Sequence, residues 1–256
     1  MARVDTREAV RKILFEHPAL TAQTSVVPPR SSPLPLPVLR ALPSGRDSYE
    51  ISRQLGALLA HLVLQHGHRS VLEFGAGASS RVVAAALEAQ GGGMLTSVEA
   101  DPSWCADAWM DVEASPHVDS EMVAAPVSFV VGWWGVGYAQ PAARERIAAR
   151  GPYDLLLIDA PGGNYGRLGT LPLVGSALEP GATIVVDDAA GHRTQWLIAC
   201  WLRMYPDLRL WAYDPTFADR GMALLRWRGG AARVSGRAWV GSVYHALSCW
   251  RRRREG

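Results

Sequence analysis

Short apolar runs alternate with segments of helical periodicity along the middle of the chain. An apolar run of about four to eight residues between turn signals is typical of a strand buried on both faces. Such runs predict strands at residues 70–74, 94–98, 127–131, 153–158 and 182–186. Because helical segments separate these strands, we expect a doubly wound parallel sheet with helices on both faces, an α/β fold.

The predicted helices lie before the first strand and between the strands. Ser48 is a suitable cap for a helix that continues through Leu62, since its hydroxyl can accept a hydrogen bond from the first turn. The other helices are predicted at residues 80–90, after the pair Asp101-Pro102, within residues 168–178 with glycine interruptions, and around Trp196 to Leu202.

Two more strands are predicted near the end of this region, at residues 208–213 and 222–227. The connection between them, residues 214–221, is too short for a parallel crossover. They must therefore pair antiparallel. The result is a mostly parallel seven-stranded sheet with a C-terminal antiparallel hairpin.

The two ends of the chain differ from the middle, so we divide the sequence into residues 1–47, 48–228 and 229–256. Residues 6–15 have a helical apolar face, and six prolines then crowd residues 28–43. Prolines at this density predict an extended strap, either a plain linker or a lid over a cleft. At the other end, an amphipathic helix precedes the basic run 251–254, which we interpret as a solvated tail.

Composition places the chain among ordinary globular proteins. Of its 256 residues, 48% are hydrophobic and 20% are charged, and the net charge is +2. This suits one large α/β domain and calls for no nucleic-acid partner. Cys105, Cys200 and Cys249 lie far apart, which predicts reduced thiols and a cytoplasmic protein. No apolar run reaches the roughly 18 residues of a membrane span, so no membrane partner is expected. A homo-oligomer is compatible with the sequence.

The strongest motif runs from Glu73 to Ser80. A buried strand ends in an acid, and Gly75, Ala76 and Gly77 then lead into a helix that begins near Ser79. Glycine lets the backbone turn tightly and approach a ligand closely. This pattern indicates a nucleotide-like cofactor. Ser79 and Ser80 are either helix caps or contacts to that cofactor.

Carboxylates follow the predicted strands where each strand ends. Glu73, Glu99, Asp159 and the pair Asp187-Asp188 all fall at such positions. Ligands of open α/β sheets bind at this edge, and acids there suit hydroxyls, an amino group, a metal ion or a sulfonium. Glu99 comes 24 residues after Gly75, where an acid clamps ribose hydroxyls. Glu73 would lie near a cationic amino group of the cofactor, unless it is a structural acid.

Taken together, the ordered motifs resemble the class I S-adenosylmethionine-dependent methyltransferases. The resemblance covers residues 48–228 and rests on Glu73-x-Gly75-x-Gly77, Glu99, the run from Tyr153 to Asp159 and the run from Pro180 to Asp188. It implies a Rossmann-like methyltransferase fold, with the glycine turn at the methionine part of the cofactor and Glu99 at its ribose. Ala125 is then expected beside the adenine.

The later acids extend the resemblance to metal-dependent O-methyltransferases of the catechol and macrocin types. Asp159, Asp187 and Asp188 could meet at one cleft and hold Mg²⁺, which prefers oxygen ligands. The catechol type has a lysine base shortly after its first ligand; here Asn164, Tyr165 and Arg167 stand in that region. The alternative is that Asp159 contacts cofactor or substrate without a metal, while Asp188 caps the next helix.

For several other side chains, both a functional and a purely structural role fit the sequence. His192 is a candidate general base or a solvent-facing loop histidine. Trp133, Trp134 and Tyr138 form either a wall for an aromatic or glycan acceptor or ordinary core. Arg167 and Arg193 either bind an acidic group of the substrate or lie on the surface.

The function expected from this sequence is methyl transfer to a small-molecule acceptor, a hydroxyl of a secondary metabolite or sugar, with Mg²⁺ assistance. An NAD(P)-dependent oxidoreductase is the main alternative. Glu73, the terminal hairpin and Ser80 in place of a third glycine count against it. A non-methylating relative that only binds the cofactor also fits, because fold does not determine chemistry.

Overall fold

The computed structural model describes residues 17–21, 33–44, 50–162, 165–230, 232–233 and 236–255. Seven of the strands form one sheet: β1 (Ser70–Phe74), β2 (Gly93–Glu99), β3 (Val118–Ala124), β6 (Tyr153–Ile158), β7 (Leu178–Asp187), β8 (Arg209–Asp214) and β9 (Met222–Arg226). Their order is β3-β2-β1-β6-β7-β9-β8. The five strands from β3 to β7 are parallel, and β9 is antiparallel to both of its neighbours. The predicted sheet and terminal hairpin are confirmed.

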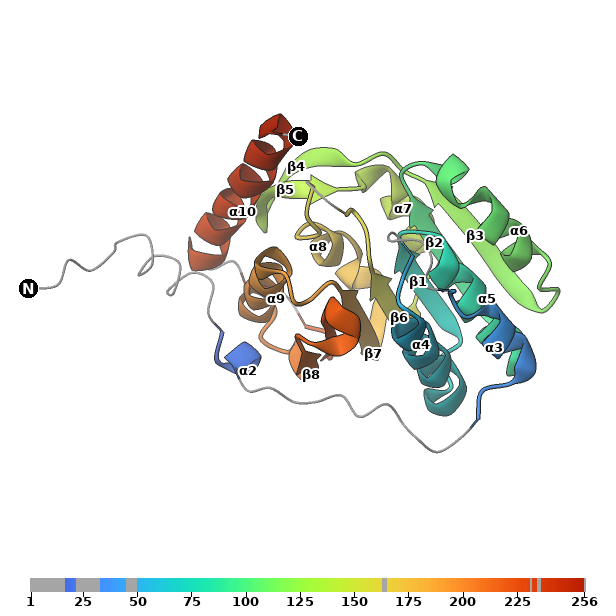
Figure 1. The fold of residues 1–256 in the computed structure, drawn as a ribbon. Coiled ribbons are helices and arrows are strands. Elements are labelled where there is room, and N and C mark those ends of the chain that lie inside the picture. The colour runs from blue at the N-terminus through green and yellow to red at the C-terminus, as the bar shows by residue number, and fades with distance from the viewer. Residues whose placement is uncertain are drawn as a thin grey trace, which may run out of the picture.

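Helices cover both faces of this sheet (Figure 1). One face packs against α3 (Leu36–Ala41), α4 (Arg53–His66), α5 (Ala78–Ala89) and α6 (Ala106–Glu113). The other packs against α7 (Arg144–Arg150), α8 (Thr170–Val174) and α9 (His192–Met204). Short 3-10 turns lie at Pro102–Cys105, Pro141–Ala143, Gly175–Ala177 and Phe217–Asp219. Two apolar cores result, because side chains of a strand alternate between the two faces of the sheet.

The third strand of the sheet is not where the sequence pattern placed it. The apolar run at 127–131 belongs to β4 (Ser128–Gly132), which pairs antiparallel with β5 (Gly135–Ala139) in a separate two-stranded sheet. The strand beside β2 is β3, an edge strand whose polar residues Asp119 and Glu121 form ion pairs with Arg150. These charges hide β3 from a search for continuous apolar runs.

A long C-terminal helix, α10 (Gly236–Glu255), packs on the β4–β5 hairpin (Figure 1). The hydroxyl of Ser242, which is buried, accepts a hydrogen bond from the main-chain N–H of Val136 at 3.0 Å. The helical backbone reaches Glu255, so the basic run continues this helix, and its interpretation as a solvated tail stays a prediction.

The N-terminal segment contains two short helices in its described part, α2 (Pro18–Thr21) and α3. The expectation of an extended strap is wrong for α3, which tolerates Pro37 because proline fits the first turn of a helix. The predicted helix at 6–15 and the predicted cap Ser48 lie outside the described residues. Ser52 caps α4 instead, with its hydroxyl accepting from the N–H of Leu55 at 3.0 Å.

All three cysteines lie in the described part of the chain, where they are buried and form no disulfide. Among the described helices, none is both long enough and apolar enough to cross a membrane.

Candidate active site

The turn between β1 and α5 has the close backbone approach that its glycines predict. Gly75 has a φ of +97°, and a Cβ added there would lie 3.1 Å from the Cβ of Ala160. Both the left-handed conformation and the neighbour therefore favour glycine. At Gly77, an added Cβ would meet no atom within 4 Å. The space in front of Gly77 is open, so a ligand can reach the backbone of the turn.

Glu73 is fully buried beneath this turn. Its Oε1 accepts hydrogen bonds from the hydroxyls of Ser80 and Ser97, and the Ser80 oxygen accepts from the N–H of Gly77 at 2.9 Å. The acid thus connects β1, β2 and the start of α5. Its Oε2 has no hydrogen-bond partner within the described part of the chain. Burial raises the pKa of Glu73 to about 7, although the serine hydroxyls oppose this change.

The two serines of the motif serve the turn itself. Ser80 stands at the third position of α5 and forms the hydrogen bonds described above, while the Ser79 hydroxyl donates to the carbonyl of Gly75 at 3.4 Å. Both side chains are buried. These contacts agree with the capping interpretation, and a contact of either serine with a cofactor stays a prediction.

Glu99 reaches back from the end of β2 to the glycine turn. Its Oε2 accepts from the N–H of Ala76 at 3.1 Å, and its Oε1 accepts from the N–H groups of Ala100 and Asp101 at 2.6 and 2.9 Å. Ala125 follows β3 directly and donates its N–H to the carbonyl of Glu99 at 2.8 Å. The ends of three neighbouring strands thus bring Gly75, Glu99 and Ala125 to one edge of the sheet.

The three aspartates lie together at the ends of β6 and β7. Asp159, Asp187 and Asp188 each offer one carboxylate oxygen, and these oxygens lie within 4.8 Å of one another. Burial raises the pKa of Asp159, and it raises the pKa of Asp187 to about 7, with the neighbouring carboxylates adding to the effect. Asp187 is only 4% exposed, and its Oδ2 has no partner among the described residues.

Arg167 lies among these carboxylates. Its Nη2 is 3.0 Å from Oδ1 of Asp159 and 2.8 Å from Oδ2 of Asp188, and its Nη1 donates to the main-chain carbonyl of Asp187 at 2.7 Å. The side chain is only 7% exposed. The interpretation of Arg167 as a surface arginine is therefore wrong. Its position inside the cluster of acids was not foreseen.

This arrangement bears directly on the expected Mg²⁺ site. Three carboxylate oxygens are the right kind of ligand, and Mg²⁺ needs them at about 2.1 Å in an octahedral arrangement. Two of the three carboxylates are already bound to the Arg167 guanidinium. The residues as arranged do not fit a metal ion on these oxygens unless Arg167 moves away.

The beginning of α9 shows whether Asp188 caps this helix and where His192 lies. Gly191, not Asp188, is the N-cap of α9, and no side chain caps it. The capping role considered for Asp188 is wrong, because α9 begins only after Gly191, and Asp188 itself lies in the loop before the helix with a φ of 55°. His192 is the first residue of α9 and is exposed. Its role as a base stays a prediction. Arg193 donates to the carbonyl of Ser248 at 3.4 Å.

The aromatic residues considered as an acceptor wall do not act as one group. Trp134 is buried in the core and packs near Gly137 and Gly169. Trp133 is 48% exposed. Tyr138 is buried and has its ring 5.2 Å from that of Tyr165, in the loop that leads to Arg167. The contact joins residues 27 positions apart in the sequence, so no local pattern predicts it.

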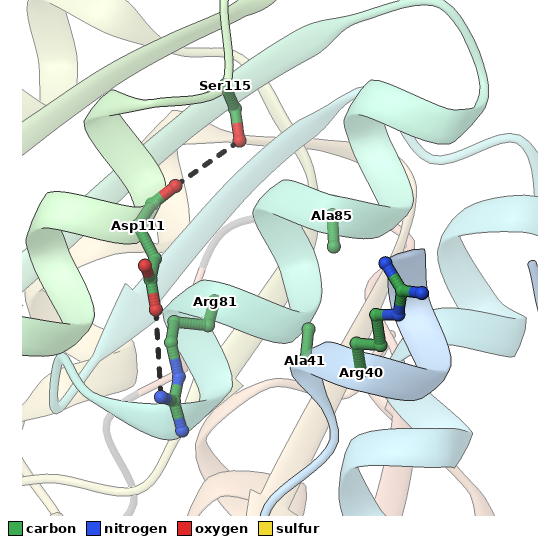
Figure 2. Close-up of a pocket in the computed structure, with 6 residues that line it drawn as sticks. All are labelled: Arg40, Ala41, Arg81, Ala85, Asp111 and Ser115. Carbon is green, nitrogen blue, oxygen red and sulfur yellow. Dashed lines mark hydrogen bonds and ion pairs between the residues drawn. The ribbon is translucent and has the colours of Figure 1, made fainter. Parts of the chain in front are cut away.

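A surface hollow of about 230 Å³ lies elsewhere, among α3, α5 and α6. Figure 2 shows the ion pair of Arg81 with Asp111 at one side of it and Arg40 at the other. No predicted site residue lines this hollow. The candidate active site is therefore defined by the edge of the sheet and not by this hollow.

The sheet order, the antiparallel β9 and the glycine turn after β1 together define a class I methyltransferase fold. Residues 72–189 match the family model described as a methyltransferase domain. A sequence comparison with curated proteins gives no match. The resemblance inferred from the sequence motifs is thus confirmed for the fold and for the domain that residues 72–189 form.

Two solved structures illustrate the similarity. An O-methyltransferase from Bacillus cereus in complex with SAH is 18% identical, with 74% of this chain and 88% of that chain covered and a TM-score of 0.52. The O-methyltransferase TomG from Streptomyces achromogenes, involved in tomaymycin synthesis and solved with SAM, is 17% identical, with 77% and 91% covered and a TM-score of 0.54. At these identities, the likeness establishes the fold.

The raised pKa of Glu73 predicts a pH-dependent stability. The unfolded chain has an ordinary glutamate pKa near 4.5, whereas the folded chain keeps the proton up to about pH 7. The native state thus binds more protons between these values, so its free energy of unfolding falls as the pH rises through this range, by up to about 3 kcal/mol. Urea unfolding of the wild type and of Glu73→Gln, at about pH 5 and about pH 8, measures this loss.

Glu73→Gln retains an oxygen that can accept from Ser80 and Ser97 but has no proton to release. We expect the wild type to lose more stability than Glu73→Gln over the same pH interval. Glu113→Gln, which changes an exposed glutamate of α6, should follow the wild type. Equal losses in the wild type and in Glu73→Gln would show that Glu73 is an ordinary acid.

Proposed function

We propose that this chain transfers a methyl group from S-adenosylmethionine to a hydroxyl of a small molecule, such as a secondary metabolite or a sugar. The observation that carries the proposal is the glycine turn, which has open space in front of Gly77 and lies against the carboxylate of Glu99. Ligands of open α/β sheets bind at this edge. The two solved relatives with SAM or SAH bound share the fold, which supports this choice of cofactor.

The turn and the ends of β2 and β3 would bind the cofactor. Gly75, Ala76 and Gly77 would approach its methionine part through the backbone, and Ala125 would lie beside the adenine. Glu99 would accept the two ribose hydroxyls. Its carboxylate oxygens already accept from main-chain N–H groups of the turn, so they are held at the surface that the ribose would meet. Ser79, Ser80 and Asp159 complete the set assigned to the cofactor.

Glu73 suits a supporting role for the same cofactor. Its partnerless Oε2 is a buried acceptor beneath the turn, and a cationic amino group would satisfy it. Its Oε1 fixes the start of α5 through Ser80. The partnerless oxygen favours a ligand that can donate a hydrogen bond there, such as the amino group of S-adenosylmethionine, over the pyrophosphate of a dinucleotide, which has only acceptor oxygens.

The remaining residues would align the acceptor and remove its proton. S-adenosylmethionine supplies a methyl group that its sulfonium already activates, so alignment and proton removal are the tasks left to the protein. We assign the proton to Asp159. This residue directly follows β6, next to the glycine turn. Burial raises its pKa, although the Arg167 guanidinium opposes this, and the net rise makes it a stronger base than an ordinary aspartate. His192 is the second candidate base, at the beginning of α9.

Calorimetric titration of the folded protein tests the choice of cofactor. We expect S-adenosylmethionine and S-adenosylhomocysteine to bind, and we expect NAD not to bind, because Glu73 lies beneath the turn. Formation of S-adenosylhomocysteine in the presence of catechols, phenols or sugars then tests methyl transfer. Binding of NAD without binding of S-adenosylhomocysteine would show that the oxidoreductase alternative is correct.

A substitution at Glu99 tests the predicted ribose contact. Glu99→Gln keeps one oxygen but loses an acceptor and the negative charge. We expect S-adenosylhomocysteine to bind about 10 to 100 times more weakly, since a hydrogen bond to a charged group contributes about 1.5–3 kcal/mol. Asp101→Asn is the matched control, because it changes an exposed acid two residues further on. Unchanged affinity in Glu99→Gln would contradict the ribose assignment.

A further inference from the structure

We propose that the guanidinium of Arg167 takes the place of a divalent cation at the three aspartates, so that methyl transfer by this chain uses no metal ion. The inference rests on the proposed function for the reaction, but its central claim concerns the cation that these carboxylates bind. It departs from the Mg²⁺ site that the spacing of Asp159, Asp187 and Asp188 predicts.

Arg167 contacts all three acidic residues, two through their carboxylates and Asp187 through its main-chain carbonyl. One nitrogen, Nη2, bridges Asp159, which follows β6, and Asp188, which follows β7, at 3.0 and 2.8 Å. The other, Nη1, donates to the main-chain carbonyl of Asp187 at 2.7 Å. One planar group therefore contacts all three acidic residues. A guanidinium can do this because its donors are arranged in a fixed fork.

The chain on both sides of Arg167 is fixed, which holds the guanidinium in the cluster. Leu168 is fully buried, and its carbonyl accepts from Nε1 of Trp201 at 2.9 Å. On the other side, Gly166 has a φ of +73° and packs so closely on α10 that an added Cβ would lie 2.3 Å from Cε1 of His245. A segment packed between α9 and α10 cannot readily withdraw its side chain.

A metal ion and this guanidinium would compete for the same oxygens. A divalent cation coordinated by Asp159 and Asp188 would lie close to Nη2, which contacts both carboxylates. Two positive charges at that separation in a largely buried site repel each other strongly. Binding of a metal would therefore require Arg167 to leave, and its buried charge would then have no partner in the cluster.

The test measures metal binding directly, on the full chain without cofactor. Mn²⁺ is the probe, since it takes the same oxygen ligands as Mg²⁺ and gives an electron paramagnetic resonance signal. We expect the wild type not to bind Mn²⁺ up to about 1 mM, the range of weak oxygen-ligand sites. We expect Arg167→Met, which keeps an apolar stem but frees the carboxylates, to bind one Mn²⁺ at least about 10 times more tightly.

Two further variants show where the gained ion binds. Arg167→Met combined with Asp187→Asn should lose the gained Mn²⁺ binding, because one ligand has been removed. Arg193→Met, which removes an arginine that contacts α10 and not the aspartates, should behave as the wild type. If Arg167→Met does not fold, the wild-type titration, together with treatment of the wild type by EDTA before the assay of methyl transfer, still decides the question.

Each result bears on the proposal. Wild-type binding of one Mn²⁺ per chain at micromolar concentration, or loss of methyl transfer after EDTA treatment, would overturn it. No gain of binding in a folded Arg167→Met would overturn it as well, since the guanidinium would not then be what excludes the metal. Titration of the same wild-type preparation with S-adenosylhomocysteine separates this question from the proposed function, which fails if that ligand does not bind.

Discussion

The repulsion among carboxylates at one edge of the sheet is the constraint that organises this protein. Parallel strands end at the same edge, and β1, β2, β6 and β7 each have an acid at that end or one residue from it. Each acid is stabilised in a different way. Glu73 receives serine hydroxyls, Glu99 receives main-chain N–H groups, and Asp159 and Asp188 share Arg167. Asp187 and Glu73 each keep one oxygen without a partner among the described residues, and burial raises the pKa of both.

Much of the fold could be predicted because the central strands are buried on both faces. Strands such as β1 and β6 read as continuous apolar runs and end where the pattern ends. The edge strand β3 could not be found in this way. One part of it faces solvent, so it carries Asp119 and Glu121, which pair with Arg150. The apolar run at residues 127–131, predicted to be this strand, instead forms β4 of the separate hairpin that packs against α10. Local periodicity cannot distinguish a strand of that hairpin from a strand of the main sheet.

The candidate site was partly visible in the sequence for the same reason. Acids at strand ends need only the topology to bring them together, so the approach of Asp159 to Asp187 could be expected from the order of the strands. Arg167 could not be found, since an arginine in a loop is exposed in most proteins. Its burial depends on how residues 166–168 pack between α9 and α10, which are contacts between distant parts of the chain.

In the proposed reaction, the cation at this edge would determine how an acceptor hydroxyl loses its proton. A metal ion binds the acceptor oxygen and lowers its pKa, so only a weak base is needed. A guanidinium that already forms ion pairs with two carboxylates would lower the pKa of an acceptor hydroxyl much less than a metal ion does. Proton removal then depends on a protein base whose pKa is close to neutral. Burial moves the pKa of Asp159 in that direction. In the proposed reaction, Asp159 would be the carboxylate that burial prepares for the proton transfer, and the Arg167 guanidinium opposes this rise of its pKa.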